Sequence, residues 1–346
     1  LYIKATSGAL TMICSTVVAI DPNTPVNLAF FTQPPASAVA GDNFTTMPEV
    51  EIQDTYGNRV TTASSSINLE AHTNGTCSSA AGGAFGVTTS PLATSSGLSS
   101  YTGVNYDTEE VIYLRAYDGT YTEVCSTAVS VIPAPADHIE ISAGGTQTIT
   151  AGACSAVVTL QTRDQYGNIT TNQSGGTTVT LSTDSAGGGG TDFYTDVGCT
   201  ASAGGSVNIA DLSSTTTIYY KDELAGTPTL TVTVAGFTTQ NSDNTGFTID
   251  PDVADHIEFS AGLAQTVTAG VCSAIITAQT KDQFGNITTD NPGNTTVTLS
   301  SDSTGTKDFY TDVGCTASAA GSIDILDTSS SETFYYKDTK AATPTR

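Results

Sequence analysis

The chain has 346 residues, a formal net charge of −24 and an isoelectric point near 4.1. This charge excludes nucleic acid and anionic membrane surfaces as partners, because both would be repelled. Only 13% of the residues are charged, tryptophan is absent, and no segment has the roughly twenty consecutive apolar residues of a membrane span. Short runs in which threonine and valine alternate favour an all-β chain of many strands.

The first elements along the chain are expected within residues 1–22. Residues 2–16 match residues 113–127 without a gap, since both have a Tyr, a basic residue and an Ala, followed later by Cys-Ser-Thr. We therefore interpret residues 1–22 as the last two strands of a preceding, incomplete domain. The chain starts at Leu1, inside one of these expected strands, which indicates a processed or excised piece of a longer protein.

Internal repeats set the organisation of the rest. The run Asp-His-Ile-Glu at residues 137–140 recurs 118 residues later, and the run from Asp192 to Cys199 recurs 116 residues later. The repeats predict two copies of one domain, which we name domain 2 (residues 137–252) and domain 3 (residues 253–346). Residues 23–136 are a more distant copy, domain 1. Because the chain stops where a last strand should begin, domain 3 is predicted to lack that strand.

Each copy contains strands with an alternating pattern. In the clearest case, Leu230, Val232 and Val234 are separated by threonines. One apolar face and one hydroxyl-rich face are what a sandwich of two β-sheets needs. The linkers between copies are short and contain proline, whose fixed φ favours a stiff connection.

A five-residue turn recurs in all three copies, as Asp54-Thr55-Tyr56-Gly57-Asn58 and again at residues 164–168 and 282–286. Its glycines, Gly57, Gly167 and Gly285, are expected to supply a positive φ. The Asp and Asn are expected to cap nearby amides, and the aromatic residue to pack back on its own strand. These are structural positions and not reactive ones.

The Asp-x-(Tyr/Phe)-Gly-Asn turn, in repeats of this length, resembles that of bacterial immunoglobulin-like repeats of the invasin/intimin type. The resemblance implies tandem immunoglobulin-like β-sandwich domains arranged as beads on a string. It also implies a role as a stalk, filament or adhesive arm on a microbial surface. The abundant cysteines depart from the usual pattern of such repeats.

The seven cysteines are explained by the repeats. The predicted disulfides are Cys77–Cys125, Cys154–Cys199 and Cys272–Cys315. Cys14 matches Cys125, so its partner is expected outside the chain. Free or metal-binding thiols are the alternative, but the sequence has no CxxC and no nearby histidine cluster. Disulfides indicate an oxidising, extracellular setting at the cell surface.

Two further kinds of site are candidates. Six Asn-x-Ser/Thr sequons are possible glycosylation sites: Asn43, Asn74, Asn168, Asn172, Asn286 and Asn294. For Asn168 and Asn286, which lie in the repeated turn, a structural role in that turn is the alternative. Asp250, Asp252 and Asp255 lie within six residues of a linker and are weak candidates for calcium, against a solvated acidic loop. We expect no other cofactor.

No catalytic set is present, because three histidines and no nucleophile, P-loop or zinc-protease motif do not make an active site. The sequence therefore predicts an extracellular structural protein, the repeat unit of a disulfide-stabilised fibre, stalk or self-assembling filament. Its partners would be other copies of itself or further repeats of the same chain. The alternative is an adhesin that binds a host receptor or glycan through exposed loops.

Copies could be joined if the strand at residues 10–20 of one copy completed domain 3 of another. The alternative is a segment of a longer repeat chain. The alternative is favoured by residues 2–5, which duplicate residues 335–338, a strand that domain 3 already has.

Overall fold

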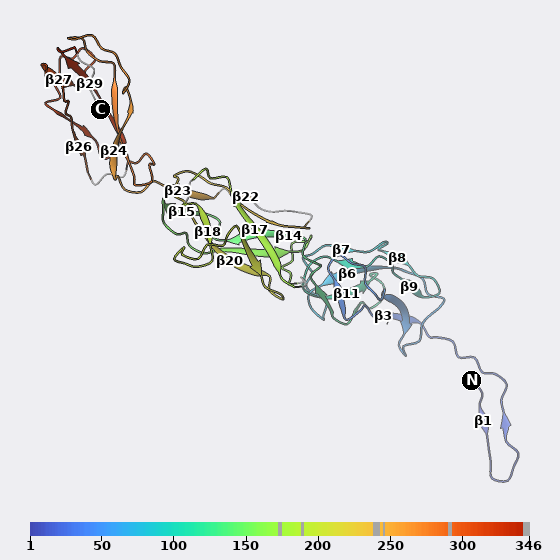
Figure 1. Cartoon of the computed structure of the whole chain (residues 1–346). Coiled ribbons are helices and arrows are strands. Elements are labelled where there is room, and N and C mark those ends of the chain that lie inside the picture. The colour runs from blue at the N-terminus through green and yellow to red at the C-terminus, as the bar shows by residue number, and fades with distance from the viewer. Residues whose placement is uncertain (172–174, 188–189, 238–242, 245, 290–292, 342–346) are drawn as a thin grey trace. The chain divides into compact units, whose positions relative to one another are not determined.

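The computed structural model describes the chain except for residues 172–174, 188–189, 238–242, 245, 290–292 and 342–346 (Figure 1). The regular elements of this described part are β-strands, and none of it forms a helix long and apolar enough to cross a membrane. The all-β class predicted from the sequence is confirmed. Contacts divide the chain into two compact units, Leu1–Asp137 with Arg163–Gln173 and His138–Thr162 with Ser174–Arg346.

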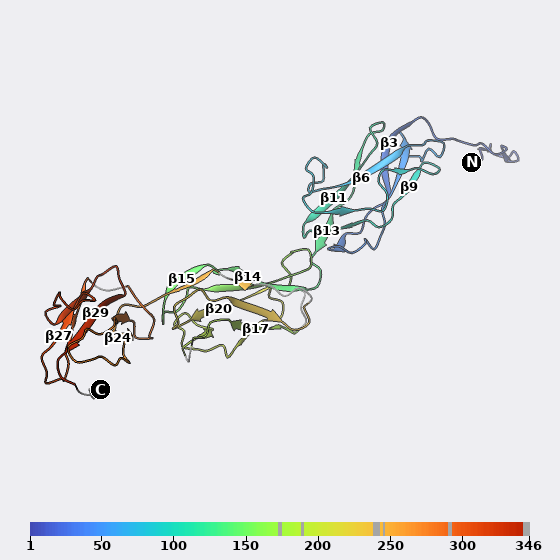
Figure 2. The same ribbon diagram turned by 90° about the horizontal axis from the view of Figure 1, so that it is seen from above.

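The first unit contains a hairpin (Figure 1) and the sandwich of domain 1 (Figure 2). The hairpin is β1 (Lys4–Ala5) and β2 (Ile13–Cys14). One sheet has the order β3-β5-β9, and the other has the order β4-β13-β11-β6-β8 with β12 beside β11; β7 pairs with β10. The bounds are β3 (Pro25–Thr32), β4 (Ser37–Val39), β5 (Glu49–Asp54), β6 (Ser66–His72), β7 (Phe85–Gly86), β8 (Leu92–Ala93), β9 (Leu98–Ser100), β10 (Asn105–Tyr106), β11 (Val111–Tyr117), β12 (Val124–Cys125) and β13 (Val129–Ile132).

The second unit contains the sandwich of domain 2, with sheets β14-β16-β20-β18 and β19-β17-β21-β22. A last strand, β23, pairs with β15 in parallel. The bounds are β14 (His138–Ala143), β15 (Gln147–Thr150), β16 (Val158–Arg163), β17 (Thr177–Thr183), β18 (Asp192–Tyr194), β19 (Ser206–Ile209), β20 (Thr215–Lys221), β21 (Leu230–Val234), β22 (Asp243–Asn244) and β23 (Phe247–Asp250).

Domain 3 repeats this plan in part, with sheet β24-β25-β29-β27 and the pair β26-β28. The bounds are β24 (His256–Ala261), β25 (Ile276–Lys281), β26 (Thr295–Thr298), β27 (Lys307–Tyr310), β28 (Ser322–Ile325) and β29 (Ser331–Asp338). Among the described residues, domain 3 has no strand that corresponds to β21 or β23 of domain 2.

Each sandwich has its own apolar core, built by the alternation read from the sequence. In domain 2, Val158 and Leu160 of β16 and Val232 of β21 are fully buried, although they belong to different sheets. The ring of Tyr220 lies 5.6 Å from that of Phe247. Burying one such side chain contributes roughly 1.5–3 kcal/mol, so the inward-facing residues drive the two sheets together.

The strand pairing corrects one point of the sequence comparison. Residues 2–5 resemble both residues 113–116 of β11 and residues 335–338 of β29, but these two strands occupy different places. β11 lies between β6 and β13, whereas β29 lies between β25 and β27. In domain 2 the place of β11 is taken by β21, which pairs with β17. Residues 2–5 therefore match a strand that the described part of domain 3 lacks.

Candidate functional site

The repeated turn is built around a buried aspartate with four hydrogen bonds. In domain 3, Oδ1 of Asp282 accepts from the amides of Phe284 (2.9 Å) and Asn286 (2.8 Å). Oδ2 of Asp282 accepts from the Asn286 side chain (2.8 Å) and from the amide of Asp252 in the linker (2.9 Å). Asp282 is 0% exposed. Four donors on one carboxylate compensate for burying its charge and fix the linker to the turn.

The same set of bonds recurs in the other two turns. Asp164 accepts from Ala134 N (2.9 Å) and Asp54 from Asn23 N (2.8 Å), as Asp282 does from Asp252. Gly57, Gly167 and Gly285 have φ of 82°, 86° and 87°, a conformation that favours glycine. The linker therefore meets its own domain in one fixed way at each copy.

We expect acid to unfold domain 1 partly through Asp54. Burial raises the pKa of Asp54, but the amide of Asn23 and the side chain and amide of Asn58 outweigh this and hold the pKa at about 2. Because the pKa is lower in the folded state, the stabilisation is complete above pH about 4 and is lost as the pH falls towards about 2. Urea unfolding followed by circular dichroism at a series of pH values should show this decline. Asp54→Asn should be less stable near neutral pH and should show a shallower decline, because other carboxylates of the domain still contribute; an unchanged decline would contradict the assignment.

The turn also reaches the preceding domain. Within the first unit, the Asn168 side chain donates to Asp107 O (2.8 Å), and its Oδ1 accepts from Glu109 N (2.8 Å). In the second unit, Asn286 does the same with Glu223 O (2.8 Å) and Ala225 N (2.9 Å). One amide side chain thus pairs with a backbone carbonyl and a backbone amide two residues apart in both places.

The aromatic residue of the turn differs from the expectation. It does not pack back on its own strand but lies over a glycine of the preceding domain, where a Cβ on Gly41 would be 1.8 Å from Oη of Tyr166 and a Cβ on Gly152 would be 2.4 Å from Cζ of Phe284. Phe284 packs against the apolar core of domain 2. The reason is steric, because the glycine leaves a flat backbone surface that admits a ring.

The turn of domain 1 presents the same groups without this contact in the described part of the chain. Tyr56 is 79% exposed, against 42% for Tyr166. The side chain of Asn58 bonds to Asp54, at 3.1 Å to Oδ2. Sequence reasoning missed the glycines that receive the ring, although Ala-Gly occurs at the same place in each copy, at Gly41, Gly152 and Gly270.

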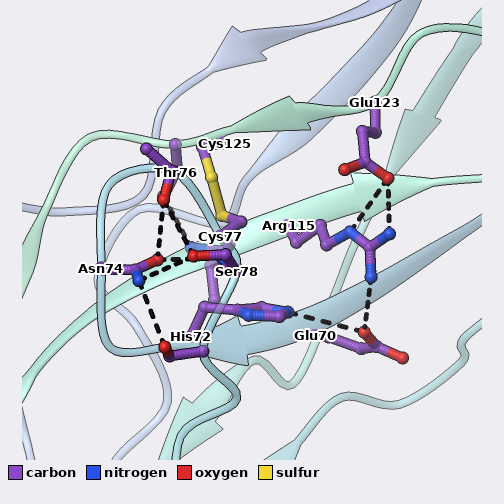
Figure 3. Close-up of a disulfide and its surroundings, with 12 residues drawn as sticks. Glu70, His72, Asn74, Thr76, Cys77, Ser78, Arg115, Glu123 and Cys125 are labelled. Atoms are coloured by element: carbon purple, nitrogen blue, oxygen red, sulfur yellow. Dashed lines mark hydrogen bonds and ion pairs between the residues drawn. A yellow bond between two sulfur atoms is a disulfide. The ribbon is translucent and has the colours of Figure 1, made fainter.

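Three disulfides are present, Cys77–Cys125, Cys154–Cys199 and Cys272–Cys315, and Cys14 is free and exposed. Figure 3 shows the first of them beside the turn of Asn74, whose carbonyl accepts from Cys77 N at 2.9 Å. Nearby, Nε of Arg115 lies 3.1 Å from a Glu123 oxygen. In each domain, one cysteine lies in the turn after a strand (β6, β18 or β27). The partner cysteine lies on the segment that pairs with the opposite edge of the neighbouring strand (β11, β20 or β29).

A serine follows the cysteine in each of these strands, and the sequence reasoning did not use it. Ser155 N donates to Tyr220 O and Ser155 Oγ accepts from Tyr220 N, both at 2.9 Å. In the hairpin, Ser15 N donates to Ile3 O (2.8 Å) and Ser15 Oγ accepts from Ile3 N (2.9 Å). The hairpin of residues 1–22 therefore has the same local bonds as a complete domain.

The six sequons fall into three groups. Asn168 and Asn286 are only 9% and 7% exposed, and their side-chain amides donate to Asp164 and Asp282 in the turn. Asn43 and Asn294 are exposed and Asn74 is half-buried. Asn172 lies outside the described residues.

The linker aspartates are not brought together as a calcium site. Among the residues that the structure describes, no group of three or more His, Cys, Asp or Glu side chains could hold a metal ion. Asp252 accepts from the Gln283 side chain (3.1 Å), and Asp255 lies 3.1 Å from His256. The carbonyl of Asp250 accepts from Ala151 N (2.8 Å). These contacts hold the linker in place.

No protein-family model and no curated protein match the chain. Solved structures similar to it include InvD of Yersinia pseudotuberculosis, at 16% identity and a TM-score of 0.34, covering 92% of this chain and 83% of that one. The D00-D0 domain of intimin matches at 14% identity and a TM-score of 0.29, covering 63% and 97%. Domains 5-6 of the S-layer protein SbsC match at 18% and 0.23, covering 66% and 99%. Invasin and intimin structures are thus among those similar to this chain.

Proposed function

We propose that this chain is a structural, non-enzymatic protein of the bacterial cell surface, whose tandem immunoglobulin-like domains form a disulfide-stabilised fibre, stalk or filament outside the cell. The observation that carries the proposal is the turn, because the same side chain, ring and glycine join consecutive domains at two places. A contact that recurs at both junctions indicates a role in joining domains, because an active site would be expected at one place only. The similar structures include an S-layer protein, SbsC, which agrees with a surface setting.

The partners in this proposal are copies of the chain or further repeats of it, and strand donation between copies is one way to extend the fibre. Among the described sequons, Asn43, Asn74 and Asn294 have the exposure that suits glycosylation best. An adhesin is the second class, because surface repeats often support a terminal binding domain. A glycan array and a cell-binding assay with the whole chain would identify that role.

The junction between domains 2 and 3 provides a sharp test. Gly152→Ala should displace Phe284 and increase the angular spread between the two domains, whereas Gly270→Ala should not. The pair is matched, because the glycines have φ of 79° and 82° and so carry the same backbone strain, but a Cβ at Gly270 meets nothing within 4 Å. Small-angle X-ray scattering of monomeric protein measures the spread.

The proposal predicts that only Gly152→Ala broadens the distribution of the radius of gyration. Both variants should lose a similar free energy of unfolding. Equal scattering from the two variants would show that the ring contact does not fix the junction. The stiff fibre role would then lose its support.

A further inference from the structure

A groove of about 390 Å³ runs along one face of domain 3 and has no role in the contacts described so far. Gln265, Val267, Ile276 and Tyr336 are among its lining residues. Within the described part of the chain, no strand pairs with residues 265–268. The lining is mixed, with apolar Val267 and Ile276 beside polar groups such as Ser301 and Asp338. The groove therefore presents open backbone groups next to some apolar side chains, a setting that can accept an added β-strand.

The matching face of domain 2 shows what covers such a groove. There β15 pairs in parallel with β23, so that Gln147 lies opposite Phe247 and Ile149 opposite Ile249. Phe247 and Ile249 are 0% and 2% exposed. In domain 1, β13 covers β4 in the same way, with Val131 opposite Ala38. The occupant is thus a parallel strand with apolar side chains at alternate positions.

Residues 265–268 are already held ready for such a strand. Nε2 of Gln265 donates to Gly262 O (2.7 Å), and its Oε1 accepts from Ala274 N (2.7 Å). Gln147 makes the same two bonds in domain 2, at 2.6 Å and 2.7 Å, while paired with β23. The segment keeps this local geometry without a partner, so little ordering is needed on binding.

The sequence of residues 18–22, Val-Ala-Ile-Asp-Pro, has the pattern of residues 247–251, Phe-Thr-Ile-Asp-Pro. Ile20 is 76% exposed, whereas its counterpart Ile249 is buried. More than half of the side-chain surface is exposed in eight apolar residues of this segment: Leu1, Tyr2, Ile3, Leu10, Met12, Ile13, Val17 and Ile20. A two-stranded hairpin is marginal in water by itself, and clustered exposed apolar side chains mark an interaction surface.

We propose that residues 1–21 of one copy complete domain 3 of a second copy. This inference rests on the proposed fibre function and names its partner. Residues 18–21 enter the groove in parallel with residues 265–268, with Ile20 opposite Val267, as Ile249 lies opposite Ile149. In domain 1, β11 pairs with β6. β1 matches β11 in sequence, and β26 is the counterpart of β6 in domain 3, where its one described neighbour is β28. β1 of the donating copy therefore pairs with the open edge of β26.

The repeated turn supplies a second, independent fit. Asn23 already donates to Asp54 as Asp252 does to Asp282, so a strand ending at residue 21 leads directly into the turn of domain 1. The turn offers an exposed Tyr56. At the same end of domain 3, Gly270 has φ +82° and open space above it.

Near Gly270, domain 3 has the backbone groups Thr339 O and Ala341 N. They are the sequence counterparts of Glu223 O and Ala225 N, which Asn286 binds in domain 2. Asn58 of the second copy would bind them in the same way. Donor and acceptor surfaces lie on different domains of one chain, so the contact is heterologous and generates an open filament.

Two variants of the full chain test the joint by complementation. Ile20→Asp spoils the donor strand and leaves the groove intact, whereas Val267→Asp spoils the groove and leaves the donor intact. Each variant alone should be monomeric by mass photometry with its disulfides intact, while the unaltered chain forms a series of oligomers that lengthens with concentration. A mixture of the two variants should stop at dimers, because only one working joint can form.

Val313→Asp is the matched control, since Val313 is 75% exposed and lies outside both surfaces. It should assemble like the unaltered chain, and circular dichroism checks that every variant folds. The inference is overturned if Ile20→Asp still forms oligomers, or if the unaltered chain stays monomeric. It is also overturned if mass spectrometry of unreduced native protein finds Cys14 bridged to another segment of the same polypeptide, because the hairpin then completes a different domain. Scattering from monomeric Ile20→Asp tests the stiff junction separately, so either idea can fail alone.

Discussion

Replacing Cys154 and Cys199 together by alanine is expected to lower the free energy of unfolding of domain 2 by about 4 kcal/mol. The bridge closes a loop with a sequence separation of 45 residues, and losing it returns conformational entropy to the unfolded chain. Urea unfolding of oxidised protein, followed by circular dichroism, measures the change. The loss is large because a domain of this size is stable by only about 5–15 kcal/mol.

Cys14→Ala is the control for this experiment, because Cys14 is exposed and unbridged in the described chain. It should change the unfolding free energy by less than about 0.5 kcal/mol. A loss below about 1 kcal/mol for the double variant would contradict the chain-entropy account and would indicate that the unfolded state stays compact without the bridge.

Asp282→Ala is expected to destabilise domain 3 by about 3 kcal/mol and to loosen its contact with domain 2. The substitution removes the acceptor of four hydrogen bonds and leaves the amides of Phe284, Asn286 and Asp252 without it. The Asn286 side chain, no longer positioned by Asp282, should also lose its bonds to domain 2. Calorimetry measures the first effect, and hydrogen exchange at Ala225 N measures the second.

Asp312→Ala is a matched control, since Asp312 also accepts from two backbone amides, those of Thr316 (2.9 Å) and Ala317 (2.6 Å), but is only half-buried and lies away from the junction. It should cost less stability and leave exchange at Ala225 unchanged. Faster exchange at Ala225 in both variants would mean that domain 3 opens as a whole, and the specific role of Asp282 would be refuted.

The sequence could predict the sandwich class because alternation and repetition are local signals. The buried Val158 and Leu160 of β16 sit where period-two reasoning places inward side chains. The disulfide partners also followed from the repeats, since a cysteine at the same place in two copies needs a partner in the same copy.

What the sequence could not provide was strand order. Residues 113–116 and 335–338 look alike because both run beside a Cys-Ser strand, yet β11 and β29 pair with different neighbours. Strand neighbours depend on contacts between distant segments, which leave no periodic trace. For the same reason, the aromatic residue of the turn was expected to pack locally, although Phe284 lies over Gly152 of another domain.

The groups that receive the turn on the preceding domain are a glycine, a backbone carbonyl and a backbone amide. The residues that carry the carbonyl and amide differ, Asp107 and Glu109 in one place and Glu223 and Ala225 in the other, yet the bonds are the same. Because the preceding domain binds the turn through backbone groups, the side chains of the residues that carry these groups can change without breaking the bonds. Gene segments encoding such domains can therefore be duplicated, deleted or exchanged by recombination without creating a mismatched joint, so the length of the protein can evolve freely.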